Sequence, residues 1–173
     1  MGQPIPHKRV KLIIGFIFKE KTALTKAQSL ISKKMGSVDS ESEILEFYHT
    51  DYYKQEFGEK LKRKFVSLKR LVLPEDIYRV KLTSNKIEHS ISKDGKRLIN
   101  IDPGYITESK LVLLTTKDYS HRIYLRKGIY AEITLKFQSG TFRPLETTYP
   151  DYKCEDYIKF FNNIRAIYRK DTK

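Results

Sequence analysis

The densest group of potentially reactive side chains lies in residues 115–122, between an apolar run and a predicted strand. It contains two Thr, a Lys, an Asp, a Tyr, a Ser, a His and an Arg, without the Gly, Asn or Pro on which solvated loops turn. Lys117 and Arg122 would hold a phosphate or a carboxylate. Asp118 would orient His121 as a general base. Alternatively, the same side chains pin the loop to a sheet, with Asp118 capping a turn and Arg122 in a structural ion pair.

Residues 129–137 alternate between apolar and polar side chains, which predicts a strand with Tyr130 and Glu132 on its polar face. If it forms a hairpin with the preceding predicted strand, that face lies beside Arg122 and Tyr124. This surface is either the floor of a ligand site or the ordinary polar face of an antiparallel sheet. The candidate site comprises ligand-binding residues Lys117, Arg122, Tyr124 and Tyr130 and catalytic residues Asp118, His121 and Glu132.

Asp102 follows a predicted strand, and strand ends are frequent ligand positions in α/β layers. Together with three residues of the candidate site it makes an oxygen and imidazole set suited to Mg²⁺ or Mn²⁺. The set is Asp102, Asp118, His121 and Glu132. Its spacing matches no standard metal motif, and the favoured alternative for Asp102 is a turn formed with Pro103-Gly104. The identity of any cofactor is therefore open.

Two further clusters could contact other ligands. Tyrosines and acidic residues at 50–53 and 148–152 could stack on bases or sugars, or plug the edge of a core. A run of basic residues without an intervening acid could contact nucleic-acid phosphates, or form an ordinary solvated face. It consists of Lys60, Lys62, Arg63, Lys64, Lys69 and Arg70. No aromatic RNA-recognition signature or helix-turn-helix pattern accompanies this run.

The composition limits the class of protein and the number of domains. The chain has 173 residues, of which 34 are Lys or Arg and 21 Asp or Glu, giving a formal charge of +13. With 39% hydrophobic residues and no long apolar segment, it reads as one globular domain over residues 1–173, with 1–9 flexible or extended. The single cysteine, Cys154, excludes an intramolecular disulfide. We expect a cytoplasmic protein without a membrane partner, and its oligomeric state is open.

The periodicity predicts an α+β fold. Strands are expected at 10–18, 44–48, 61–68 and 98–101, with helices starting at Thr22 and Pro74. This gives the βαββαβ order of a ferredoxin-like mixed sheet. An antiparallel hairpin around residues 126–128 and a C-terminal helix near 158–168 should follow, whereas 107–116 could form either a helix or a strand.

Three short sequence motifs resemble those of a known family: Asp102-Pro103-Gly104-Tyr105, the run TTKDYSHRIYL from Thr115 to Leu125, and GIYAE from Gly128 to Glu132. With further matches over nearly the whole chain, the sequence resembles an uncharacterised bacterial family known only as a domain of unknown function. Its members sometimes carry the label "GTP-binding protein". The resemblance implies no established activity. No Gly-x-x-x-x-Gly-Lys-Ser/Thr loop is present, so a P-loop GTP site is not expected.

The leading functional hypothesis is binding of a small phosphate-bearing ligand, such as a nucleotide, in a pocket built by residues 102–134. The alternatives are a metal-assisted hydrolase or phosphotransferase, and a nucleic-acid-binding module that uses the basic run. Whether the protein is an enzyme is open.

Overall fold

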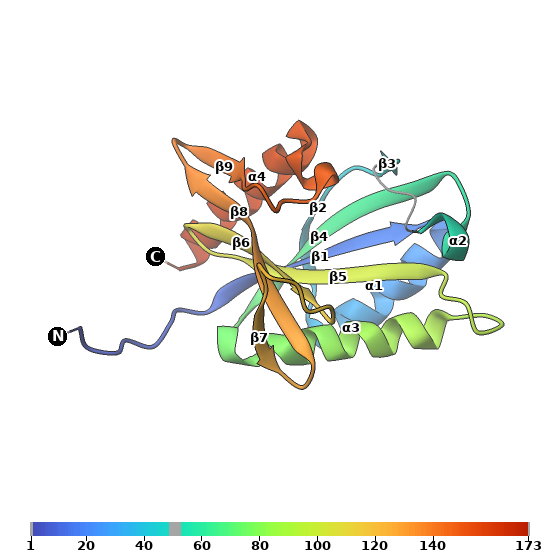
Figure 1. Cartoon of the computed structure of the whole chain (residues 1–173), viewed down its shortest axis with the longest axis horizontal. Helices are drawn as coiled ribbons and strands as arrows, with labels where there is room; N and C mark the ends of the chain where they lie inside the picture. Colours follow the sequence, from blue (N-terminus) through green and yellow to red (C-terminus); the bar gives the residue numbers. More distant parts are fainter. Residues whose placement is uncertain (1, 49–52, 173) are drawn as a thin grey trace.

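A computed structural model describes residues 2–48 and 53–172 and places nine strands of the described chain in one sheet (Figure 1). The strands are β1 (Val10–Phe18), β2 (Val38–Glu41), β3 (Leu45–Phe47), β4 (Leu61–Val72), β5 (Ile99–Ile106), β6 (Lys110–Thr115), β7 (Ile123–Arg126), β8 (Ile129–Gln138) and β9 (Thr141–Pro144). The α-helices are α1 (Lys21–Met35), α2 (Lys54–Phe57), α3 (Ile77–Ile91) and α4 (Glu155–Asp171), and the 3-10 helices are η1 (Pro74–Asp76) and η2 (Pro150–Lys153).

The sheet has the order β2-β4-β1-β5-β6-β8-β7, with β3 also paired to β4 and β9 to β8. The predicted α+β class is confirmed. The predicted mixed sheet is wrong, because every strand pairing found among the described residues is antiparallel. The reason is that α1 carries the chain from β1 to β2, which runs in the same direction as β1, and β4 lies between these two strands. The insertions of β3 and α2 also leave the strict ferredoxin-like order unestablished.

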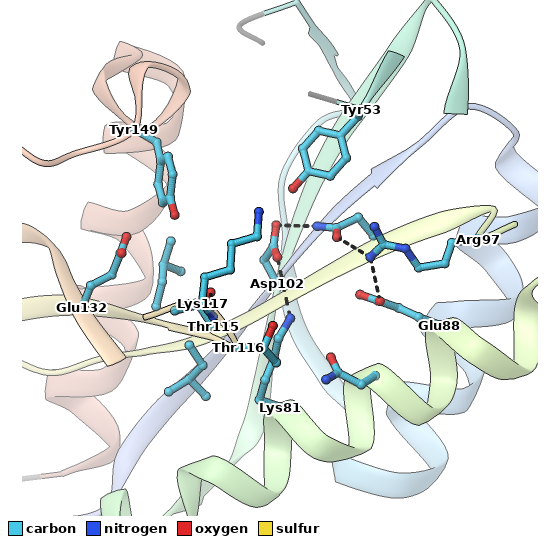
Figure 2. A pocket seen from close by; sticks show the side chains of 14 residues that line it. Tyr53, Lys81, Glu88, Arg97, Asp102, Thr115, Thr116, Lys117, Glu132 and Tyr149 are labelled. Atoms are coloured by element: carbon cyan, nitrogen blue, oxygen red, sulfur yellow. Dashed lines mark hydrogen bonds and ion pairs between the residues drawn. The ribbon is translucent and has the colours of Figure 1, made fainter. Parts of the chain in front are cut away.

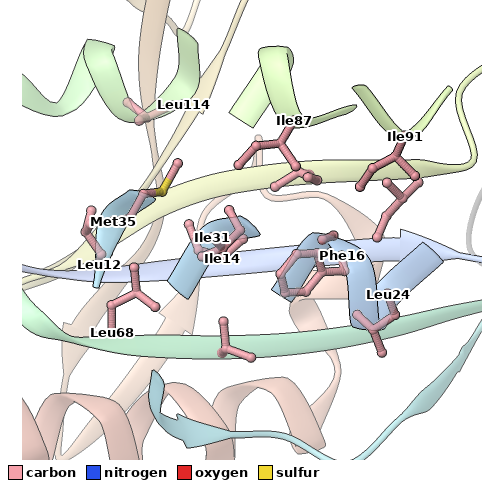
Figure 3. Packing of buried hydrophobic residues seen from close by; sticks show 14 of the residues in the cluster. Leu12, Ile14, Phe16, Leu24, Ile31, Met35, Leu68, Ile87, Ile91 and Leu114 are labelled. Atoms are coloured by element: carbon pink, nitrogen blue, oxygen red, sulfur yellow. The ribbon is translucent and has the colours of Figure 1, made fainter. Parts of the chain in front are cut away.

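Strand β1 is the centre of the molecule and is buried along its whole length, as its nearly continuous apolar sequence predicts. Leu12, Ile14 and Phe16 face one way, into the core beneath α1 and α3 (Figure 3). Ile13 faces the opposite way, into a second core that includes Phe161 of α4. The sheet is thus covered on both faces.

The helices place their apolar stripes on this sheet. Ala27, Ile31 and Met35 of α1 fall at helical spacing and are buried, as are Phe161 and Ile164 of α4. The predicted helices from Thr22 and near the C-terminus are therefore confirmed. The helix predicted from Pro74 begins as η1 and continues as α3. Among the described residues, no helix combines the length and the apolar character needed to cross a membrane.

The second half of the chain builds an antiparallel extension. The segment left open between helix and strand is strand β6. The predicted hairpin is β7 and β8, joined at Lys127 and Gly128, which have φ angles of 52° and 75°. Positive φ at both residues is the geometry of a tight hairpin turn whose twist matches that of the strands.

Strand β5 departs most from the sequence expectation. Residues 102–104 do not form a turn, because β5 continues through them to Ile106 and Pro103 pairs with Ile14 of β1. On its other side, β5 pairs with β6 only from Gly104 onward. Pro103, which lacks a backbone N–H, therefore lies just before the start of that ladder. The two strands diverge at this point.

Candidate functional site

A pocket of about 280 Å³ opens beside β5 where β6 departs from it (Figure 2). Its walls come from α3, β5, the end of β6 with the loop that follows, β8, and the segment before η2. The charged and hydroxyl-bearing lining residues include Lys81, Glu88, Asp102, Lys117, Glu132 and Tyr149. We call this cavity the polar pocket. Three of these residues, Asp102, Lys117 and Glu132, belong to the set that the sequence singled out.

Asp102 is held between two cations at the base of the polar pocket. Its carboxylate lies 3.3 Å from Nη1 of Arg63 and 3.9 Å from Nζ of Lys81. Asn100 donates a hydrogen bond to it from Nδ2 at 2.7 Å. Lys81 also donates to the carbonyl oxygen of Ile101 at 3.0 Å, which fixes the ammonium beside the pocket. Asp102 therefore orders the cations around it instead of initiating a turn.

Glu88 of α3 brings a buried carboxyl to the polar pocket. It accepts a hydrogen bond from the Ile101 N–H at 2.6 Å and from Arg97 at 3.0 Å. Burial raises the pKa of Glu88, while the Lys81 ammonium and these two hydrogen bonds oppose that rise. A carboxyl with a raised pKa in a cavity can hold a proton near a ligand.

The sequence interpretation missed both Lys81 and Glu88. The signal that could have found them is their spacing, because Lys81, Asn85 and Glu88 recur at helical intervals and line one side of α3. The three polar residues lie beside the apolar stripe and so resemble an ordinary solvated face.

Arg122 and Glu132 form a buried ion pair beside the polar pocket, which Glu132 lines. Nε of Arg122 donates to Glu132 at 2.7 Å, and the two side chains are only 1% and 3% exposed. The guanidinium also donates to the Lys117 carbonyl at 3.0 Å and to the Tyr149 hydroxyl. Its centre lies 4.3 Å from the Tyr119 ring centroid. These contacts match the structural alternative considered for Arg122.

The other candidate residues are distributed around this pair. Nε2 of His121 lies 3.1 Å from Glu132, so Glu132 takes the place expected for Asp118 as its carboxylate partner. Asp118 lies close enough to Tyr130 to affect its pKa, which burial and then the Asp118 carboxylate raise. The rings of Tyr124 and Tyr130 pack edge to face with centroids 5.2 Å apart. Neither tyrosine lines the polar pocket.

The proposed metal ligands are not gathered in one place. Within residues 2–48 and 53–172, no group of three or more His, Cys, Asp and Glu is arranged to hold a metal ion. Of the predicted set, His121 and Glu132 meet, whereas Asp102 is engaged by Arg63 and Asp118 lies near Tyr130. The four residue types can bind a metal ion, but the strands and the loop that hold them place them at separate positions.

A second pocket of about 370 Å³ adjoins the first and shares Tyr53, Lys117 and Tyr149 with it. Its remaining lining is mainly apolar and aromatic and includes Phe47, Tyr119, Pro150 and Tyr152. We call it the aromatic pocket. Burial, followed by the nearby Glu132 carboxylate, raises the pKa of Tyr149 to about 12, so this hydroxyl stays protonated at neutral pH.

Arg63 forms part of the aromatic pocket and is only 1% exposed. It donates to the Tyr152 hydroxyl at 2.6 Å, and its guanidinium lies 4.7 Å from the Phe65 ring centroid. Its Nε is buried with no hydrogen-bond partner among the described residues. A buried donor without a partner is costly, and a bound polar group or water would relieve that cost.

The two tyrosine-containing clusters at 50–53 and 148–152 contribute residues to the walls of the two pockets. Tyr53, Tyr149 and Tyr152 line pockets, and Asp151 lies 3.9 Å from Arg63. Residues 50–52 of the first cluster lie outside the described residues.

The basic run does not form one surface. Successive side chains of β4 alternate between the two faces of the sheet, so Lys62 and Lys64 point away from the face on which Arg63 is buried. Lys64 is also paired with Glu41 at 3.2 Å. Of the six residues, Lys60, Lys69 and Arg70 are exposed.

Comparison with known proteins identifies a family but no characterised relative. No curated protein matches the chain, and no solved structure matches it either. A family model described as "Domain of unknown function (DUF4416)" matches residues 8–168. That match includes every strand of the described sheet and all the pocket residues named above. The protein therefore belongs to the DUF4416 family.

Proposed function

We propose that the two adjoining pockets bind a small phosphorylated molecule that carries a planar ring, of which a mononucleotide is the simplest example. The observation that carries this proposal is the shared wall. Tyr53, Lys117 and Tyr149 line both the polar and the aromatic pocket, so one ligand can occupy both.

The polar pocket suits the phosphate. Lys81 and Lys117 come from different elements and line the same cavity, together with the hydroxyl-bearing Thr115 and Thr116. Figure 2 shows Lys117 between Tyr149 and Tyr53, to the left of Asp102. Ammonium and hydroxyl groups are strong donors to phosphate oxygens. The carboxylates nearby would accept hydrogen bonds from sugar hydroxyls.

The aromatic pocket suits the ring. Phe47, Tyr119 and Tyr152 add aromatic surface to that of the two shared tyrosines. Stacking of a base on such side chains contributes about 1–3 kcal/mol and tolerates different bases. The two cavities measure about 280 and 370 Å³, which lie near the lower end of the usual range for small-molecule sites.

The proposal is tested by calorimetric titration and thermal unfolding with the four nucleoside monophosphates, one nucleoside and inorganic phosphate. A monophosphate should bind more tightly than the nucleoside or phosphate alone, and should raise the melting temperature. Lys117→Gln should weaken monophosphate binding about tenfold or more, because a hydrogen bond to a charged group contributes about 1.5–3 kcal/mol.

Lys136→Gln is the matched control, since Lys136 is exposed on β8 and lines neither pocket. The Lys136→Gln variant should bind the monophosphate with the affinity of the wild type. Equal binding of nucleoside and monophosphate, or no stabilisation by any monophosphate at millimolar concentration, would contradict the proposal.

A further inference from the structure

A basic groove lies in a different part of the molecule from the two pockets and shares no lining residue with them. It measures about 530 Å³ and is formed where the start of β1, the end of α1, the end of β4 and the start of α3 meet. Four cationic side chains line it: Arg9, Lys34, Arg70 and Arg79. Aliphatic side chains, among them the buried Leu12 and Met35, contribute the apolar part of the lining.

The charge of this groove is poorly compensated. Of the described residues that line it, Asp76 alone is acidic, and it lies 3.2 Å from Arg79. In the part of the chain that the structure describes, Arg9, Lys34 and Arg70 have no carboxylate within ion-pair distance. Three positive charges therefore share one concave surface without a paired carboxylate among the described residues. An anionic partner would release the counterions that such a surface attracts from solution.

We propose that the basic groove binds the sugar-phosphate backbone of a polynucleotide without reading its sequence. Three of the four cations are arginines, whose planar guanidinium can donate two parallel hydrogen bonds to one phosphate. Among the described residues, the lining includes no aromatic side chain on which a base could stack, so the contacts are confined to phosphate and sugar.

The surroundings of the groove favour a long polyanion over a single small anion. Lys8 and Lys33 are exposed and each adjoins a groove cation in sequence, which extends the positive surface beyond the cavity. Residues 2–9 are also exposed and leave the fold as an extended segment beside the start of β1 (Figure 1). The formal charge of +13 adds a long-range attraction for any polyanion.

The test is fluorescence anisotropy with a labelled 20-nucleotide oligouridylate at several salt concentrations. Four phosphate contacts predict a slope of about −2.8 for log K against log[salt], since each contact to a single strand contributes about 0.7. The triple variant Arg9→Gln, Lys34→Gln, Arg70→Gln should reduce the slope to about −0.7 and weaken binding about 100-fold at 0.1 M salt. All three side chains are exposed, so its melting temperature should stay close to that of the wild type.

The control is a triple variant that removes the same charge elsewhere: Lys26→Gln, Lys136→Gln, Lys153→Gln, all exposed and none in the groove. It should retain most of the affinity and the slope. An equal loss in both triple variants would overturn the proposal, because binding would then follow net charge alone.

Two further measurements identify the partner. Poly-L-glutamate of similar length should compete poorly with the oligouridylate, and competition at equal concentration would assign the groove to acidic proteins and refute polynucleotide binding. Lys117→Gln should bind oligouridylate as the wild type does. This separates the groove from the mononucleotide site, because loss of nucleotide binding leaves the groove result unchanged.

Discussion

Arg122 and Glu132 are the residues whose role the structure defines most directly. Both are almost fully buried, and Arg122 joins the loop after β6 to β8 and to Tyr149. Breaking a buried ion pair by removing one partner leaves an uncompensated charge in a low-dielectric interior. The pair therefore maintains the walls of both pockets.

We predict that Glu132→Gln lowers the free energy of unfolding by about 3–5 kcal/mol, measured by urea denaturation at pH 7. Glu41→Gln is the control, because Glu41 is 56% exposed in its pair with Lys64 and should cost at most about 1 kcal/mol. A cost for Glu132→Gln as small as that of the control would show that Arg122 does not depend on this partner.

Strand alternation supported one contact that the structure shows. The alternating pattern of β8 placed Glu132 on the face expected beside Arg122, and the two side chains form an ion pair. The predicted pairing of Asp118 with His121 rested only on their closeness in sequence. In the structure, the carboxylate next to His121 is that of Glu132. Closeness along a loop does not fix the direction of a side chain, whereas a strand does.

At the scale of elements, the divergence of β5 and β6 creates the polar pocket. The backbone of β6 lies close to Gly104 of β5. A Cβ there would collide with the Val112 carbonyl oxygen and lie 2.9 Å from a Leu113 methyl carbon. Only glycine permits this approach without a shift of β6.

We predict that Gly104→Ala destabilises the protein by about 1–3 kcal/mol, the usual cost of overpacking, as measured by urea denaturation. Because β6 must move, Gly104→Ala should also weaken monophosphate binding in the calorimetric titration. If the free energy of unfolding of the alanine variant lies within about 0.5 kcal/mol of the wild-type value, as for neutral surface substitutions, β5 and β6 accommodate a Cβ at residue 104 without strain.

The sequence predicted the principal helices, β1 and the β7–β8 hairpin, because their apolar periodicity and turn residues agree with the final structure. It failed at residues 102–104, where Asp-Pro-Gly has strong turn character. Pairing with β1 overrides that local preference and keeps the segment extended. The position of the polar pocket depends on this override, so local patterns could not have located it.

At the scale of the whole molecule, a second buried charge joins the two ends of the fold. Lys11 of β1 is 0% exposed, and its ammonium contacts Asp39 at 2.5 Å and Asp171 of α4 at 2.8 Å. Tyr168 adds a hydrogen bond from its hydroxyl to the Arg9 carbonyl at 2.9 Å. These contacts hold the last helix against the first strand.

We predict that the double variant Asp39→Asn, Asp171→Asn loses about 3–5 kcal/mol of stability, because the Lys11 ammonium is then buried without a counter-charge. Asp171→Asn alone should have the smaller effect of the two single changes, since Asp171 is 38% exposed and Asp39 only 19%. Hydrogen exchange should accelerate first in α4. Unchanged exchange there would mean that apolar packing alone secures the helix.

The central position of β1 has a consequence for synthesis of the chain. Its nine residues, VKLIIGFIF, are all buried in the final structure, yet they precede both of their strand partners. The ribosome must make the chain through residue 72 to complete β4, and through residue 106 to complete β5, before both edges of β1 can pair. In that interval an apolar, β-branched segment without a charge after Lys11 is open to self-association. Newly made chains of this protein should therefore depend on chaperones more than the small size of the folded product suggests.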